Sequence, residues 1–274
     1  MRYFRLFSVI FLVFSLLFFV WANYQFNKNN NTDFPVFSAT DGVLELSIND
    51  PYEAIFEGLS ATDATDGDLT KDIMVASISH FFDDYSVNVK YVVFDSHNNS
   101  STFTRKVKYT DYTSPVFTLD TPPVYTLGRS FDLLNHIKVQ DCLDGDISGR
   151  IRVVSNMVNN YSTGNYPVLL EVTNSFGDVS QITIWVSYLS KENSVSVKLH
   201  QYIVYVEKGE EFDPYKWISS VTDRYAVELD ESLVEIQGNL DVNTLGSYQL
   251  IYSYNDGKLS GQSPLTVVVT ERER

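Results

Sequence analysis

One pattern recurs three times along this chain at intervals of about 80 residues, and it constrains the fold more than any other feature. Each copy has an aspartate followed further on by a tyrosine. The pairs are Asp63 with Tyr85, Asp141 with Tyr166, and Asp223 with Tyr248. After each tyrosine come an alternating apolar–polar stretch, a polar turn and a second such stretch, as in two antiparallel strands. The spacing therefore predicts three small folding units in tandem.

Strand signals dominate the sequence between residues 33 and 274, in stretches such as "VNVKYVVF", "YPVLLEVT" and "QITIWVSY". β-branched and aromatic residues fill these stretches, and Asn, Asp, Gly and Ser separate them. Units of this size with short strands are typical of immunoglobulin-like (Ig-like) sandwiches. We predict an all-β body of three tandem Ig-like antiparallel β-sandwiches. The expected boundaries are 33–112, 113–190 and 191–274.

The recurring tyrosine has a defined place in such a sandwich. A tyrosine at the start of the penultimate strand forms a tyrosine corner, in which its hydroxyl donates to the backbone a few residues upstream. We predict this structural role for Tyr85, Tyr166 and Tyr248. Cys142 is the only cysteine, so no intrachain disulfide can form and apolar cores must hold the units together.

Motifs in all three units resemble those of a known family. The second unit contains "VQDCLDGDIS" and "TGNYPVLLEVTN", and the first contains "SATDATDGDLT". The third keeps "SVTD" and "LGSYQLIYSYND" but reads "VTDRYAVELD" where the others have Asp-Gly-Asp. Over about 240 residues the chain is similar to bacterial surface Ig-like domains, which occur in tandem on Gram-positive cell-surface proteins and in some insecticidal crystal toxins. The resemblance implies the fold and a surface location, and it implies little about a ligand.

The Asp-rich loops of the first two units allow two interpretations. Their aspartates are Asp63, Asp66 and Asp68 in the first and Asp141, Asp144 and Asp146 in the second. Aspartate and glycine build turns through local backbone hydrogen bonds and positive φ, and this structural interpretation is favoured. A calcium site made by the same carboxylates is the alternative, although their spacing and flanking strands differ from those of a helix–loop–helix calcium site. No other cofactor is expected.

The N-terminal region has a different character from the rest of the chain. Two arginines in "MRYFR" precede an uncharged run of seventeen residues from Leu6 to Ala22. Such a run is at the short end for a membrane-spanning helix, and the arginines predict a cytoplasmic N-terminus. We predict a single-pass signal anchor over 1–24, a polar stalk over 25–32 and an extracellular C-terminal body. Cleavage after the small residues Val20 and Ala22 is the alternative.

Charge and motif content exclude several classes of function. The net charge of −15 argues against nucleic acid as a partner, because phosphate binding needs a basic surface. The four histidines are scattered, and the sequence has no phosphate loop or nucleophile elbow. An enzyme is therefore not expected.

We predict a non-enzymatic, membrane-anchored cell-surface protein that acts as a spacer, scaffold or adhesion module, with other envelope proteins or glycans as partners. A carbohydrate receptor is one alternative, because exposed aromatic residues favour recognition surfaces. The candidate patch in the third unit consists of Tyr202, Tyr215, Trp217 and Tyr225. An accessory subunit of a membrane complex is the other alternative.

Overall fold

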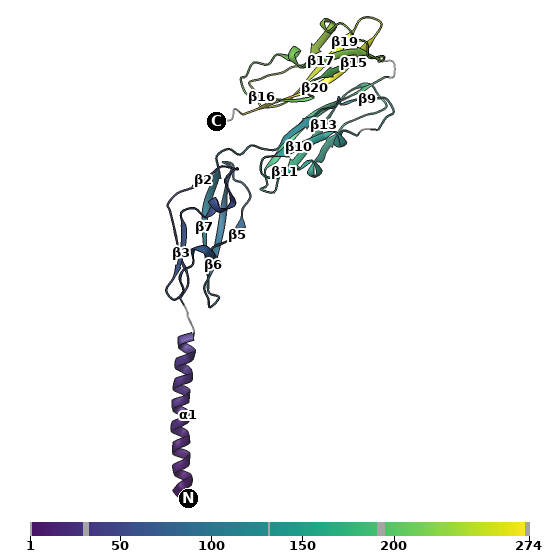
Figure 1. Cartoon of the computed structure of the whole chain (residues 1–274). Helices are drawn as coiled ribbons and strands as arrows, with labels where there is room; N and C mark the ends of the chain where they lie inside the picture. The colour runs from purple at the N-terminus through teal and green to yellow at the C-terminus, as the bar shows by residue number, and fades with distance from the viewer. Residues whose placement is uncertain (1, 30–32, 131, 191–194, 272–274) are drawn as a thin grey trace. The chain divides into compact units, whose positions relative to one another are not determined.

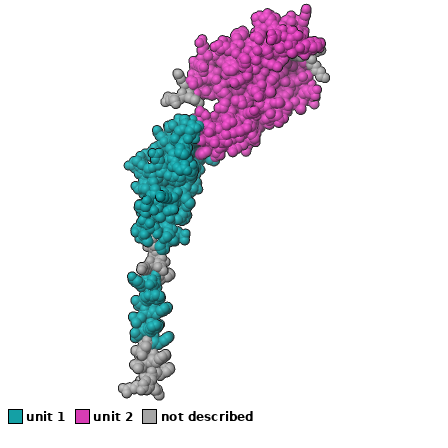
Figure 2. Space-filling model, viewed as in Figure 1, with its two compact units in different colours: residues 1–111 teal, residues 112–274 magenta. Residues whose placement is uncertain are grey.

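The computed structural model describes residues 2–29, 33–130, 132–190 and 195–271. The chain divides into two compact units, residues 1–111 (unit 1) and residues 112–274 (unit 2) (Figure 2). The division lies one residue from the expected boundary at 112/113. The expected boundary between 190 and 191 adjoins residues 191–194, which lie outside the described residues.

One long helix, α1 (Arg2–Asn29), covers the apolar run (Figure 1). Phe11, Leu16 and Trp21 are among its exposed large apolar side chains. The helix continues through residues 25–29, which we expected to be a non-helical stalk, because no glycine or proline follows Ala22 to end it. Residues 30–32 of the expected stalk lie outside the described residues. Among the described residues, no helix is both long enough and apolar enough to cross a membrane.

Unit 1 contains one β-sandwich. One sheet has the order β1–β3–β4, with β1 Val36–Ala39, β3 Leu59–Asp63 and β4 Gly67–Asp68. The other has the order β2–β7–β6–β5, with β2 Leu44–Leu46, β7 Ser100–Tyr109, β6 Ser86–Phe94 and β5 Met74–Ile78. All pairs are antiparallel except β2 with β7, which is parallel.

The core of unit 1 forms where these two sheets face each other. Val87, Val89, Tyr91 and Val93 are fully buried, and they alternate along β6 with more exposed residues, as expected for a strand with one face in the core. The Tyr91 hydroxyl donates to the carbonyl oxygen of Ile55 at 2.6 Å, so this buried polar group is satisfied.

Unit 2 contains two sandwiches. The sheets of the first have the orders β8–β10–β11 and β9–β14–β13–β12. Their strands are β8 Val116–Leu119, β9 Val124–Thr126, β10 Ile137–Asp141, β11 Gly145–Asp146, β12 Arg152–Asn156, β13 Gly164–Thr173 and β14 Val179–Leu189. The sheets of the second have the orders β15–β17 and β16–β20–β19–β18. Their strands are β15 Val195–Leu199, β16 Ile203–Glu207, β17 Ile218–Asp223, β18 Val234–Gln237, β19 Gly246–Asn255 and β20 Ser260–Thr270.

Both sandwiches of unit 2 repeat the parallel pairing of unit 1, through β9 with β14 and β16 with β20. Short 3₁₀ helices connect some strands throughout the chain. They are η1 Tyr52–Phe56, η2 Thr70–Asp72, η3 Leu133–Asn135, η4 Ser148–Arg150, η5 Pro214–Trp217 and η6 Glu231–Leu233. The prediction of Ig-like β-sandwiches is confirmed for the described residues.

The two sandwiches of unit 2 are joined by direct contacts, with β14 lying against β20. The amide of Tyr202 donates to the carbonyl oxygen of Leu119 at 3.1 Å, and the amide of Phe117 donates to the Tyr205 hydroxyl at 2.9 Å. Buried apolar residues of both sandwiches belong to one continuous hydrophobic cluster. The two sandwiches therefore form one body.

Candidate functional site

The Asp-rich loops join β3 to β4 in unit 1 and β10 to β11 in unit 2, and their first aspartates form the same turn. Asp63 Oδ1 accepts the amides of Thr65 (2.8 Å) and Asp66 (3.0 Å). In unit 2, Asp141 Oδ1 accepts the amides two and three residues ahead, at 3.0 and 2.7 Å. Gly67 and Gly145 have φ values of +77° and +71°, which favour glycine. The turn is therefore built by local hydrogen bonds.

The third aspartate of each loop faces the 3₁₀ turn that follows it. Asp68 Oδ1 accepts the amide of Thr70 at 2.9 Å, and Asp146 Oδ1 accepts the amide of Ser148 at 2.9 Å. Hydrogen bonds from the side chains and amides of these residues lower the pKa of both aspartates. Asp68 and Asp146 thus anchor η2 and η4.

The second aspartate of each loop fastens it to the turn of a neighbouring hairpin. Asp66 Oδ2 accepts the amide of Ser96 at 2.9 Å in the β6–β7 turn. Asp144 Oδ2 accepts the amide of Ser175 at 2.7 Å in the β13–β14 turn. The two loops therefore share one framework, in which Ser96 and Ser175 are counterparts.

The hairpin turns are themselves organised by equivalent residues, Asp95 and Asn174. Asp95 Oδ1 accepts the amides of His97 (2.9 Å) and Asn99 (2.7 Å). Asn174 Oδ1 accepts the amides of the residues two and four ahead, at 3.0 and 2.9 Å. A carboxylate in unit 1 and an amide in unit 2 thus perform the same structural task.

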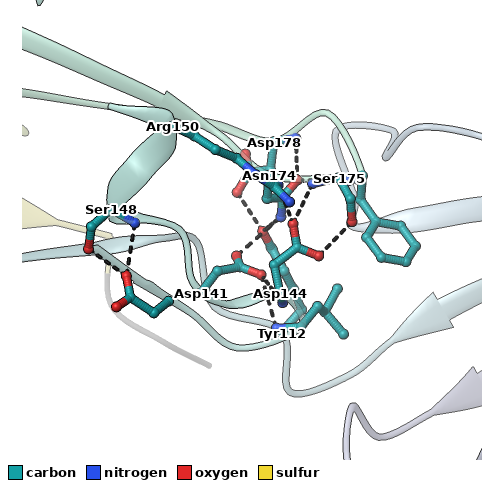
Figure 3. A network of polar contacts seen from close by, with 11 residues as sticks. Tyr112, Asp141, Asp144, Ser148, Arg150, Asn174, Ser175 and Asp178 are labelled. Atoms are coloured by element: carbon teal, nitrogen blue, oxygen red, sulfur yellow. Dashed lines mark hydrogen bonds and ion pairs between the residues drawn. The ribbon is translucent and has the colours of Figure 1, made fainter. Parts of the chain in front are cut away.

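In unit 2 the loop and the turn form a closed polar network (Figure 3). Arg150 Nη1 lies 2.6 Å from Asp144 Oδ2 in an ion pair. The Asn174 side-chain amide donates to Asp141 Oδ2 at 3.2 Å and to the Tyr112 hydroxyl at 2.8 Å. That hydroxyl donates in turn to the Asp178 carboxylate at 2.7 Å. The carboxylates of this network therefore have protein donors, as a structural interpretation of the loop requires.

This network changes the acidity of two groups. Partial burial acts to raise the pKa of Asp144, but hydrogen bonds from Ser175 and the nearby Arg150 guanidinium outweigh it and lower the pKa. Burial, followed by the contact with the Asp178 carboxylate, raises the pKa of Tyr112. Asp144 is therefore held ionised and Tyr112 neutral near neutral pH.

The equivalent network in unit 1 lacks two of these donors. Asp95 replaces Asn174, and Asp72, at the end of η2, replaces Arg150 at the end of η4. Asp63 is only 7% exposed, and its Oδ2 is sealed from solvent without a hydrogen-bond partner among the described residues. Asp66, Asp95 and His97 can each offer a ligand atom, and these atoms lie within 4.8 Å of one another.

Asp95 and His97 were missed by the sequence analysis because they belong to a different hairpin from the loop. Asp95 lies 32 positions after Asp63. The available signal was the alignment of the turn "DSHNNS" with "NSFGD", which exchanges an aspartate for an asparagine.

The third sandwich keeps only the first part of the loop framework. Asp223 Oδ1 accepts the amides of Tyr225 (2.8 Å) and Val227 (2.9 Å). Ala226 has a positive φ of +63° in this turn. The aspartate therefore still shapes a turn where the Asp-Gly-Asp segment is absent.

Two of the three recurring tyrosines make the contact expected of a tyrosine corner. Tyr166 donates to the carbonyl oxygen of Ser162 at 2.9 Å, and Tyr248 donates to that of Thr244 at 2.8 Å. The strand register corrects the third assignment. Val87 pairs with Val107 as Tyr166 pairs with Val186, so Tyr85 precedes the corner position by two residues. Tyr85, with φ of +56°, instead occupies the place of a glycine.

The candidate aromatic patch is not one surface. Tyr202 is 2% exposed and belongs to the core, where its hydroxyl accepts the amide of Leu199 at 3.2 Å. Trp217 is partly buried and stacks on Phe212. Tyr215 and Tyr225 are 61% and 71% exposed. The alternation of the "YIVYV" stretch did not reveal that Tyr202 precedes the strand and turns inward.

Comparison with known proteins gives partial similarities. No protein-family model matches the sequence. The chain is 27% identical over 139 residues to the pesticidal crystal protein Cry22Aa of Bacillus thuringiensis, and 30% identical over 146 residues to an uncharacterized 81.3 kDa protein of Acholeplasma phage L2. These matches cover 48% and 51% of this chain and 19% of each relative.

The chain also matches solved structures of known proteins. The chain matches Drosophila N-cadherin EC1–3 with a TM-score of 0.31 and 12% identity, over 89% of this chain and 91% of that one. It matches Clostridium perfringens ZmpB, in a structure of the M60 catalytic domain with two CBM51 domains, with a TM-score of 0.25 and 12% identity. That match covers 88% of this chain and 31% of ZmpB.

Proposed function

We propose that this chain is a non-enzymatic cell-surface protein whose Ig-like sandwiches serve as a scaffold or adhesion module. The observation that carries the proposal is the joining of the two sandwiches of unit 2 into one body, through backbone hydrogen bonds and a continuous hydrophobic cluster. Such a body holds its surfaces in fixed positions, which suits a protein that supports or attaches others. The Asp-rich loop of unit 2 supports a structural role, because its polar groups are used within the fold.

Membership of the bacterial surface Ig-like domains is part of this proposal. The motifs of units 1 and 2 support it, together with the partial similarity to the crystal protein Cry22Aa. The scaffold role is proposed for this chain alone, because the match spans about a fifth of that relative.

Attachment to a membrane through α1 is the finer part of the proposal. The uncharged run from Leu6 to Ala22 supports it, as do the exposed apolar side chains along the described part of α1. The test is alkaline carbonate extraction of membranes from cells that express the full chain or a variant lacking residues 2–29. The full chain should stay in the membrane pellet and the shortened chain should be released. Release of both would contradict the anchor.

The test of adhesion is binding of fluorescently labelled residues 33–271 to purified cell envelope. Saturable retention is expected for an adhesion module. Retention that periodate oxidation of the envelope abolishes, and that Tyr215→Ala with Tyr225→Ala weakens, would instead favour the glycan-binding alternative. That alternative draws on Tyr215 and Tyr225, the two members of the candidate patch that are exposed. Absence of saturable retention would contradict both forms of binding.

A further inference from the structure

The loop end of unit 1 has the same framework as that of unit 2 but a different charge. Asp63 and Asp66 correspond to Asp141 and Asp144, and the backbone hydrogen bonds of each pair are equivalent. In unit 2 the remaining places hold the Asn174 amide and the Arg150 guanidinium. In unit 1 the same places hold carboxylates, and no described ion pair involves Asp63, Asp66 or Asp95.

The carboxylate of Asp63 gives an independent indication that a positive partner belongs here. It is more than nine-tenths buried, and its Oδ2 has no donor among the described residues. The equivalent oxygen in unit 2 faces the Asn174 side chain at 3.2 Å. Because Asp95 stands in the place of Asn174, we infer that Asp63 Oδ2 lies on the side of Asp95, whose Oδ2 accepts the Asn99 side-chain amide at 2.7 Å. A buried carboxylate oxygen without a donor is stabilised by a nearby cation or by a proton.

The neighbouring side chains supply a donor set for a cation. Asp66, Asp95 and His97 can bring one ligand atom each to within 4.8 Å of the others. Asp66 Oδ2 accepts the amide of Ser96, and Asp66 Oδ1 has no hydrogen bond among the described residues. One ring nitrogen of His97, Nδ1, lies 3.1 Å from the Ser96 hydroxyl, which leaves Nε2 for a ligand. Histidines that bind metals are commonly oriented through their second nitrogen in this way.

We propose that Asp66, Asp95 and His97 bind one divalent first-row transition-metal cation such as Mn²⁺ or Zn²⁺ next to the buried Asp63 carboxylate. Two carboxylates with one imidazole suit these ions better than Ca²⁺, which prefers oxygen ligands alone. The ion ties the β3–β4 loop to the β6–β7 turn, as the hydrogen bond from the Asn174 amide to Asp141 ties loop to turn in unit 2. The site is independent of the proposed scaffold function and adds a metal-dependent joint to unit 1.

The test is a titration of the purified, metal-stripped full chain in detergent with Mn²⁺, in which the free ion is counted by its electron paramagnetic resonance signal. Zn²⁺ is then measured by competition. We expect one Mn²⁺ per chain, and binding at least about tenfold weaker in Asp95→Asn and in His97→Ala. Asn at position 95 should preserve the turn, because Asn174 forms the same turn in unit 2. Circular dichroism checks that each variant is folded.

Asp68→Asn is the matched control. It removes the same charge from the same loop, but Asp68 Oδ1 faces Thr70 and Asp68 is not one of the three clustered residues. Its Mn²⁺ affinity should stay within about twofold of the wild-type chain.

Four outcomes would overturn the proposal. They are no Mn²⁺ or Zn²⁺ binding, binding that survives both Asp95→Asn and His97→Ala, two ions per chain, or Ca²⁺ binding that His97→Ala leaves unchanged while Mn²⁺ and Zn²⁺ do not bind. If His97→Ala fails to fold, Asp95→Asn alone decides the result.

Discussion

The Asp-rich loops of units 1 and 2 share a motif and a backbone, but they solve the problem of buried charge differently. In unit 2, Arg150 and the Asn174 amide supply donors to Asp144 and Asp141. In unit 1, Asp63 Oδ2 has no donor among the described residues, Asp66 and Asp95 lie close to His97, and no described ion pair involves these three aspartates. The comparison teaches that the charges of one turn motif can be compensated either by protein donors or, as we propose for unit 1, by a bound cation. Residues outside the motif determine which of the two applies.

The largest expected effect is the creation of a second metal site in unit 2. Asn174→Asp, Arg150→Asp and Phe176→His together give three positions of this network the residues that unit 1 has there. We expect the number of Mn²⁺ ions bound by the full chain to rise from one to two, because the backbone framework is already equivalent. The count comes from the same resonance titration. A triple variant that folds and still binds one ion would show that the framework differs in a way these three residues do not explain.

The same change, Asp to Asn, should have opposite effects on stability at the first loop position. Asp141→Asn places an amide group against the Asn174 amide and should destabilise unit 2 by about 1–3 kcal/mol. Asp63→Asn removes a buried negative charge whose Oδ2 has no described donor and should stabilise metal-free unit 1 by about 1 kcal/mol. Hydrogen exchange in chelator, followed separately in β6 and β13, measures each unit. If both variants destabilise their units, the proposal that Asp63, unlike Asp141, carries an uncompensated buried charge is wrong.

A smaller effect is expected at the start of the hairpin strand, where unit 1 has Val87 and unit 2 has Tyr166. Tyr166→Phe removes the hydrogen bond to Ser162 and should reduce the stability of unit 2 by about 0.5–1.5 kcal/mol. The denaturant midpoint of unit 2 measures the change. An unchanged midpoint would show that the corner hydroxyl does not stabilise this sandwich.

The smallest effect concerns pH. The folded-state pKa of Asp144 is lowered, so its ionisation stabilises unit 2 above the unfolded pKa of about 3.9 and ceases to do so as pH falls through the folded value. Hydrogen exchange near Ser175 should therefore accelerate below about pH 4. Arg150→Ala removes one cause of the lowered pKa and should shift this acceleration to higher pH. An identical pH profile in the variant would contradict a contribution from the ion pair.

Local sequence patterns were sufficient to predict the strands and the turns. Alternation along β6 identified its buried face, and Asp-Gly pairs identified turns whose glycines have positive φ. They did not identify Asp95 and His97 as neighbours of the loop, because that contact depends on how a later hairpin folds back. Tyr85 was misplaced because the count from one tyrosine to the next does not reveal a two-residue difference in strand register. Tyr202 was predicted to lie in an exposed patch because the sequence pattern near a strand end does not show whether an aromatic side chain points inward or outward.

The parallel strand pairs have a mechanical consequence. In each sandwich an early strand lies parallel to the last one, as β2 does to β7, β9 to β14 and β16 to β20. Tension applied to the two ends of a sandwich pulls these paired strands in opposite directions along their length. Their backbone hydrogen bonds are then loaded together in shear instead of opening one after another. The β16–β20 pair, which extends from Ile203 to Glu207, is longer than the three-residue pairs of the other sandwiches. Under load it should give way last, which force spectroscopy would register as the highest rupture force.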